Sequence, residues 1–269
     1  RAFMTIDEAL AGEAGLAGIQ WVLYGAPVQR ALCEAITALL EPSTTLHDWR
    51  LLRAKAKPGR KLTAYYALTL SGVTGSIAPT RAIAVTWRLP SRAEAITISS
   101  PTAAVTPMEA EAVASGIAAP FHRLLTTAAA WRMQIEVAPL DPTFPSLVRV
   151  MTPEHVATLL APHTPASLDQ VTTIRYRPRQ RHVLRYDLRV PASGQPEALP
   201  FFAKLSQADE GAATCAVVAW CAEQLTRCGC DVTALQPQAW IPDDQLLLYP
   251  YAPGVPLSQL LTTSQPVRP

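Results

Sequence analysis

The sequence has little charge, few lysines and no long apolar run. Only 16% of its 269 residues are charged and 49% are hydrophobic, a composition that builds a sizeable core and excludes a disordered chain. No uninterrupted apolar stretch approaches the roughly 20 residues of a membrane-spanning helix, so we expect no membrane partner. The five cysteines are odd in number and unevenly spaced, which favours free thiols and a cytoplasmic location over a disulfide framework.

Several well-known site motifs are also absent. The sequence has no Gly-x-x-x-x-Gly-Lys-Ser/Thr phosphate loop and no Gly-x-Ser-x-Gly nucleophile turn. The cysteines at 215, 221, 228 and 230 lack Cys-x-x-Cys spacing and have no histidine nearby, so we predict no zinc site. The sequence therefore argues against a phosphate loop, a serine nucleophile turn and a zinc site, but these absences do not indicate which reaction or ligand the protein has.

Lysine is unusually scarce among the basic residues. Of 23 basic residues 19 are arginine, and three of the four lysines, Lys55, Lys57 and Lys61, lie close together. Lys204 is the single lysine of the last 200 residues and lies within the apolar run Phe201-Phe-Ala-Lys-Leu. A lysine in an apolar strand is costly unless it has an anionic partner. Lys204 is therefore the first candidate for a functional residue.

One internal repeat stands out, at an offset of 120 residues. Residues 55–68 (KAKPGRKLTAYYAL) align without a gap with residues 175–188 (RYRPRQRHVLRYDL), matching basic residues, the proline, one tyrosine and the last leucine. In the strand that follows each copy, Thr86 occupies the place of Lys204. The match covers about 14 residues, and it leaves duplication and chance both open.

Periodicity predicts an α+β protein. Helices are expected over 5–24, 28–41, 106 onward, 153–161, 208–227 and 256–262. Strands are expected over 49–56, 62–70, 81–89, 131–137, 168–177, 181–190, 199–206, 236–241 and 245–251. Prolines 162 and 165 indicate a boundary, so we predict an N-terminal α+β domain over 1–140, a linker and helix over 141–165, and a second domain over 166–269.

The second half resembles phosphotransferases of the aminoglycoside phosphotransferase and choline kinase type. The resemblance covers roughly residues 140–260: the linker DPTFPSL at 141–147, the hairpin RYRPRQRHVLRY at 175–186, FFAK at 201–204, the long helix, and LLLYPYAPGVPL at 246–257. These enzymes share the small nucleotide-gripping lobe of protein kinases. The resemblance thus implies a kinase-like N-lobe over 166–269, with 1–140 as a candidate degenerate copy of it.

The resemblance implies a role for each matched residue. Lys204 would hold the α- and β-phosphates of ATP, with Glu223 as its carboxylate partner and Glu210 as the alternative. The hairpin tip, Arg177, Arg179 and Arg181, would lie over the phosphates, and Leu248, Tyr249 and Tyr251 would contact adenine. The competing interpretations are structural: a lysine that reaches to water, a Glu223–Arg227 pair on an exposed helix face, and a solvated turn.

Phosphoryl transfer also needs an aspartate that orients the acceptor and ligands for Mg²⁺, and no His-Gly-Asp stretch follows residue 257. We therefore expect an ATP-binding fragment of a phosphotransferase for a hydroxylated small molecule, with the Mg²⁺ ligands outside this chain and no catalysis by the chain alone. The alternative is a non-catalytic kinase-like scaffold or binding module. Twelve of the 23 basic residues fall in 50–61 and 175–189, which keeps a protein or, less favoured, an RNA partner open.

Overall fold

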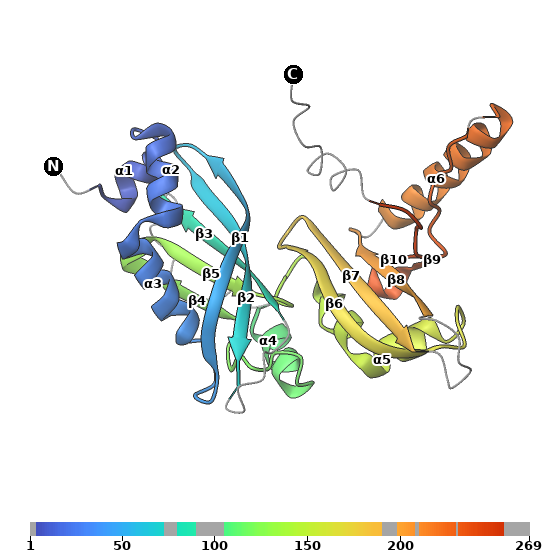
Figure 1. Cartoon of the computed structure of the whole chain (residues 1–269), viewed down its shortest axis with the longest axis horizontal. Coiled ribbons are helices and arrows are strands. Elements are labelled where there is room, and N and C mark those ends of the chain that lie inside the picture. The colour runs from blue at the N-terminus through green and yellow to red at the C-terminus, as the bar shows by residue number, and fades with distance from the viewer. Residues whose placement is uncertain are drawn as a thin grey trace, which may run out of the picture.

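Two five-stranded antiparallel sheets form the framework of the protein (Figure 1). The computed structural model describes residues 4–72, 80–89, 105–189, 198–207, 210–229 and 231–255. The first sheet has the strand order β1-β2-β3-β5-β4 and the second has β6-β7-β8-β10-β9. The α+β class predicted from the sequence is confirmed.

The elements of the first sheet follow three N-terminal helices. They are α1 (Ile6–Ala11), α2 (Gly15–Tyr24), α3 (Ala26–Thr37), β1 (Thr45–Lys57), β2 (Lys61–Ser71), β3 (Arg81–Arg88), α4 (Val105–Ala114), β4 (Leu125–Ala128) and β5 (Met133–Val137). The single helix expected over 5–24 is in fact two helices, because Gly12 ends α1 in the left-handed region at φ 89°. Strand β4 was not expected.

The second sheet is built from the elements that follow the linker. They are α5 (Pro153–Leu160), β6 (Ser167–Arg177), β7 (Arg181–Arg189), β8 (Ala198–Leu205), α6 (Glu210–Arg227), β9 (Ala239–Ile241) and β10 (Leu246–Tyr249). These agree with the expected elements to within a few residues. The helix expected over 256–262 lies outside the described residues.

The two sheets share more than their strand order. The hairpins close on the pairs Lys57–Lys61 and Arg177–Arg181, 120 residues apart. Bulges interrupt β1 at Leu46/Asp48 and Leu51/Arg53, and β6 at Leu168/Gln170 and Thr173/Arg175. A helix separates the third and fourth strands in both cases. The repeat in the sequence therefore marks the same hairpin of two sheets with matching architecture.

Each sheet has its own core. Helices α1–α3 and α4 cover one face of the first sheet, where Leu32, Ile36 and Trp87 are fully buried. The second core lies between the second sheet, α5 and the linker, and it includes Tyr65 and Ala84 from the other face of the first sheet. The second sheet thus packs against the face of the first sheet that the helices leave open.

Within the described residues, no helix is both long enough and apolar enough to cross a membrane.

Candidate functional site

Lys204 lies in the central part of the second sheet. It occupies β8, opposite Val183 of β7 and Leu247 of β10. Alternation buries Phe201, Ala203 and Leu205 in the core and places Lys204 with Phe202 on the other face. Lys204 is half-buried, and within the described residues no carboxylate oxygen lies within 4 Å of its ammonium group.

The register confirms which residue of the first sheet corresponds to Lys204. Thr86 of β3 pairs with Thr63 and Gln134, as Lys204 pairs with Val183 and Leu247. The Thr63 and Thr86 hydroxyls lie 3.3 Å apart and can hydrogen-bond to each other. In the first sheet, the side chain at this position therefore has a hydrogen-bonding partner within the protein. In the second sheet, the same position carries an ammonium group without a protein counter-ion among the described residues.

Glu223 is not brought to Lys204. It is exposed on α6, and its carboxylate pairs with Arg227 one turn further on, at 2.5 Å. Helix α6 projects away from the sheet (Figure 1), and Gly211, in its first turn, is its one buried residue. Glu223 lies twelve residues beyond that contact, so the helix axis carries it away from the sheet. The alternative partner, Glu210, begins the helix and is exposed.

The contact between α6 and the sheet depends on a glycine. A Cβ added at Gly211 would lie 2.2 Å from the indole ring of Trp240 in β9. At an exposed helical site glycine-to-alanine exchange stabilises a helix by about 1 kcal/mol, because alanine has the better propensity. At Gly211 we expect the opposite sign, because Trp240 must move to make room.

Gly211→Ala should therefore detach the start of α6 from the sheet and cost roughly 1–3 kcal/mol of local stability. Amide hydrogen exchange in α6 and β9 measures this effect, with faster exchange expected. Ala216→Gly, at an exposed position of the same helix, is the control and should speed exchange in α6 alone. Unchanged protection of β9 in Gly211→Ala would contradict the packing described here.

Arg179, at the hairpin tip, has partners within the protein. Its guanidinium pairs with the buried carboxylate of Glu136, with Nη1 3.0 Å from Oε2, and its backbone N–H donates to Oδ2 of Asp141 at 2.7 Å. Arg179 also adopts φ 62° at the turn position where the first hairpin has Gly59. Arg179 therefore anchors the second hairpin to the linker and the first sheet, and its contact with phosphates stays a prediction.

A buried histidine–aspartate pair completes this anchor. Nε2 of His182 lies 2.6 Å from Oδ2 of Asp141, and both side chains are almost inaccessible. The phenol of Tyr176 donates to the carbonyl of Leu140 at 2.5 Å. Sequence reasoning missed this pair because its members lie 41 positions apart, and the resemblance that covers both segments implied no role for either residue.

The other two arginines of the tip are not held in this way. Arg177 lies near Arg175 and Arg53, and burial together with those two positive charges lowers the pKa of Arg177. Arg181 is exposed. The structure therefore separates the three expected phosphate ligands into one anchor and two arginines with different surroundings.

The segment expected to contact adenine follows the last strand. Leu248 is fully buried in β10, and its carbonyl accepts a hydrogen bond from the backbone N–H of Gln238 at 2.7 Å. Tyr249 is half-buried, and burial, with a smaller effect of Cys215 on α6, raises the pKa of its phenol. Tyr251 is 37% exposed. Tyr249 thus shares the Lys204 face of the sheet, whereas the side chain of Leu248 belongs to the core.

No cluster of three or more His, Cys, Asp or Glu side chains suited to a metal ion occurs among the described residues. Comparison of the chain with protein-family models, curated proteins and solved structures gives no match.

Proposed function

We propose that the second sheet and α6 form the nucleotide-binding part of an ATP-dependent phosphotransferase that acts on a hydroxylated small molecule. The observation that carries the proposal is Lys204: a half-buried ammonium group on a central strand, without a carboxylate partner among the described residues. A helix between β8 and β9 and the strand order β6-β7-β8-β10-β9 support it. The protein-kinase-like identity of this sheet is part of the proposal.

The phosphates of ATP would supply the counter-charge that the protein does not. A partly desolvated ammonium group gains most from a doubly or triply charged ligand, because the attraction between the charges is stronger away from bulk water and offsets the water that both groups lose. The adjacent Phe202 and Tyr249 side chains offer apolar surface on the same face for a base. The proposal covers nucleotide binding alone and assigns no residue of this chain to acceptor orientation or to Mg²⁺ binding.

A second candidate function is a kinase-like scaffold without nucleotide binding. Two observations favour it: Glu223 is paired with Arg227, and Arg179 is committed to Glu136. Two of the groups that the resemblance places around the phosphates are therefore occupied by protein partners. A scaffold would keep Lys204 as a strand residue whose ammonium group reaches water.

Thermal unfolding with and without ATP and Mg²⁺ separates the two functions. We expect ATP to raise the melting temperature of the wild type, because a ligand that binds only the native state stabilises it. Lys204→Ala should weaken ATP binding by about ten- to a hundredfold, the loss of one charge-assisted contact. Lys55→Ala, at an exposed position of β1, is the matched control and should respond like the wild type.

Two outcomes would overturn the nucleotide proposal. One is the absence of any ATP-dependent shift in the wild type at millimolar ATP, which moves the assignment to the scaffold. The other is an equal shift in wild type and Lys204→Ala, which places the nucleotide elsewhere on the molecule.

A further inference from the structure

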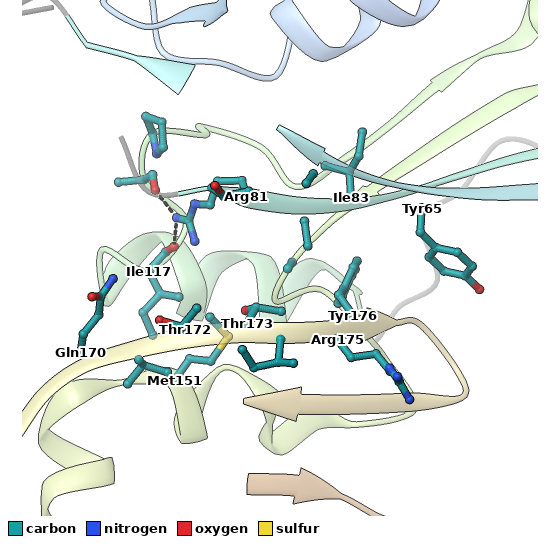
Figure 2. A pocket seen from close by; sticks show the side chains of 18 of the residues that line it. Tyr65, Arg81, Ile83, Ile117, Met151, Gln170, Thr172, Thr173, Arg175 and Tyr176 are labelled. Atoms are coloured by element: carbon teal, nitrogen blue, oxygen red, sulfur yellow. Dashed lines mark hydrogen bonds between the residues drawn. The ribbon is translucent and has the colours of Figure 1, made fainter. Parts of the chain in front are cut away.

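A groove of about 1160 Å³ lies where the two sheets meet. Its walls are the open face of β2 and β3 on one side and the outer strand β6 on the other, with the end of α4 and the start of α5 closing it (Figure 2). This volume is somewhat above the range of about 300–1,000 Å³ that is typical of small-molecule sites. None of its lining residues belongs to β8, β10 or α6, although Arg175 of β6 lies on the same face of the second sheet as Lys204, because both are opposite Val183 of β7.

Three arginines from both sheets gather at one end of the groove. Arg53 comes from β1, Arg175 and Arg177 come from β6, and Tyr65 of β2 lies among them. Figure 2 shows Tyr65 and Arg175 at the same end. The two segments that the sequence marks as basic repeats, 50–61 and 175–189, thus contribute to one site.

These three guanidinium groups have no counter-ion from the protein. Within the described ranges, no carboxylate oxygen lies within 4 Å of Arg53, Arg175 or Arg177. The described residues that line the groove also include two acids. Asp169 is paired with Arg189, and Glu154 lies in the first turn of α5. Arg177 is half-buried and Arg53 and Arg175 are exposed. Like charges held close together repel one another, and a bound anion would relieve that repulsion.

The opposite end of the groove carries a fourth arginine. Arg81 donates hydrogen bonds to the carbonyls of Ile117 and Ala119, which are neutral partners, and burial lowers the pKa of Arg81 (Figure 2). Between the two ends, β6 presents the polar side chains of Gln170, Thr172 and Thr173. The groove therefore combines a cationic end with a hydrogen-bonding wall.

We propose that this groove binds a small phosphate-bearing molecule, with its phosphate held by Arg53, Arg175 and Arg177. The guanidinium fork matches two oxygens of a phosphate, and three such groups match a phosphate monoester, whose charge approaches −2 at neutral pH. The concave shape favours a compact ligand over an extended nucleic acid, which would need an open basic surface. Because the phosphate lies between β1 and β6, binding also couples the two sheets.

Equilibrium binding of phenyl phosphate and of inorganic phosphate to the whole chain tests the site. We expect phenyl phosphate to bind, and Arg175→Gln and Arg177→Gln to weaken its binding by about tenfold or more each. Stronger binding of phenyl phosphate than of inorganic phosphate shows that the groove recognises the organic part as well; equal binding shows that the site recognises phosphate alone. Either result is compatible with the site, provided that the arginine variants lose it.

Two controls keep this test independent of the nucleotide proposal. Arg50→Gln replaces an exposed arginine of β1 outside the groove and should bind phenyl phosphate like the wild type, as should Lys204→Ala. Arg177→Lys keeps the charge but not the fork, so we expect an intermediate affinity, and this variant replaces Arg177→Gln if the latter does not fold. Loss of ATP binding in Lys204→Ala with phenyl phosphate binding intact would separate the two sites.

Three results would overturn the proposal. The first is no binding of either phosphate at millimolar concentration. The second is equal binding by wild type, Arg175→Gln and Arg177→Gln. The third is that a single-stranded RNA 20-mer binds more tightly than phenyl phosphate and displaces it, and that Arg50→Gln weakens RNA binding as much as Arg175→Gln and Arg177→Gln do. This result would identify an open polyanion surface instead.

Discussion

Replacing Asp141 by alanine should lower the free energy of unfolding by about 3–5 kcal/mol, the cost of removing a buried carboxylate that is fully hydrogen-bonded to its neighbours. Asp141 accepts three hydrogen bonds: from Nε2 of His182 at 2.6 Å, from the backbone N–H of Arg179 at 2.7 Å and from that of Thr143 at 3.0 Å. Its side chain is inaccessible to solvent, as is almost all of His182. The alanine variant leaves these donors buried without an acceptor.

Denaturant unfolding followed by circular dichroism measures this loss. Asp187→Ala is the control, because its carboxylate also pairs with an arginine of the second sheet, Arg185, but near the surface. We expect the control to cost less than about 1 kcal/mol. Similar losses in the two variants would show that Asp141 does not anchor the hairpin.

The same carboxylate makes stability depend on pH. Burial alone would raise the pKa of Asp141, but the hydrogen bonds from His182, Arg179 and Thr143, with the charge of His182, outweigh it and hold that pKa below its ordinary value of 3.8. A carboxyl whose pKa is depressed in the native state stabilises it above the unfolded-state pKa, and the contribution is lost as the pH falls through the native value. Between about pH 5 and pH 2 the wild type should thus lose more stability than Asp141→Asn.

Replacing Trp87 by alanine should cost about 3–5 kcal/mol in the first sheet. Trp87 is fully buried in β3, where it pairs with Leu62 and Met133 and packs in the core beneath α1–α3. Deleting the ring removes its burial energy and leaves a cavity that the sheet cannot close. Trp87→Phe should cost much less, because Nε1 of Trp87 has no hydrogen-bond partner among the described residues.

Trp220→Ala is the matched control for this substitution. The same side chain is deleted, but Trp220 is 60% exposed on α6, so we expect a change within about 0.5 kcal/mol. Both variants are compared by guanidinium unfolding followed by circular dichroism. A loss at Trp220 as large as that at Trp87 would mean that α6 is buried against another part of the protein.

Local pattern was enough to predict most of the fold. Strand β7 alternates between buried and more exposed positions over all nine of its residues, and the proline and basic residues at 55–61 and 175–181 mark two equivalent hairpins. Strand β4 escaped prediction because its four residues, Leu125–Ala128, are too few to show a period. The end of α1 at Gly12 escaped prediction because a single residue in the left-handed conformation does not interrupt the helical periodicity of the sequence.

The surroundings of the candidate site depend on contacts that no local pattern records. The scarcity of lysine in the sequence pointed to Lys204, and the structure places Lys204 on a central strand of the second sheet. Arg179, by contrast, finds partners 38 and 43 positions away in Asp141 and Glu136. The groove likewise depends on how β6 crosses the face of β2 and β3, so the basic character of Arg53 and Arg175 was visible in the sequence but their meeting was not.

Protection of lysines from chemical modification by ATP tests the nucleotide proposal most directly. The chain has four lysines, and three of them lie in or at the ends of the first hairpin, so each peptide reports on one region. Quantitative acetylation at limiting reagent, read by mass spectrometry with and without ATP and Mg²⁺, compares Lys204 with Lys55, Lys57 and Lys61. We expect ATP to slow acetylation of Lys204 severalfold and to leave the other three unchanged; equal rates at Lys204 with and without saturating ATP would contradict the account.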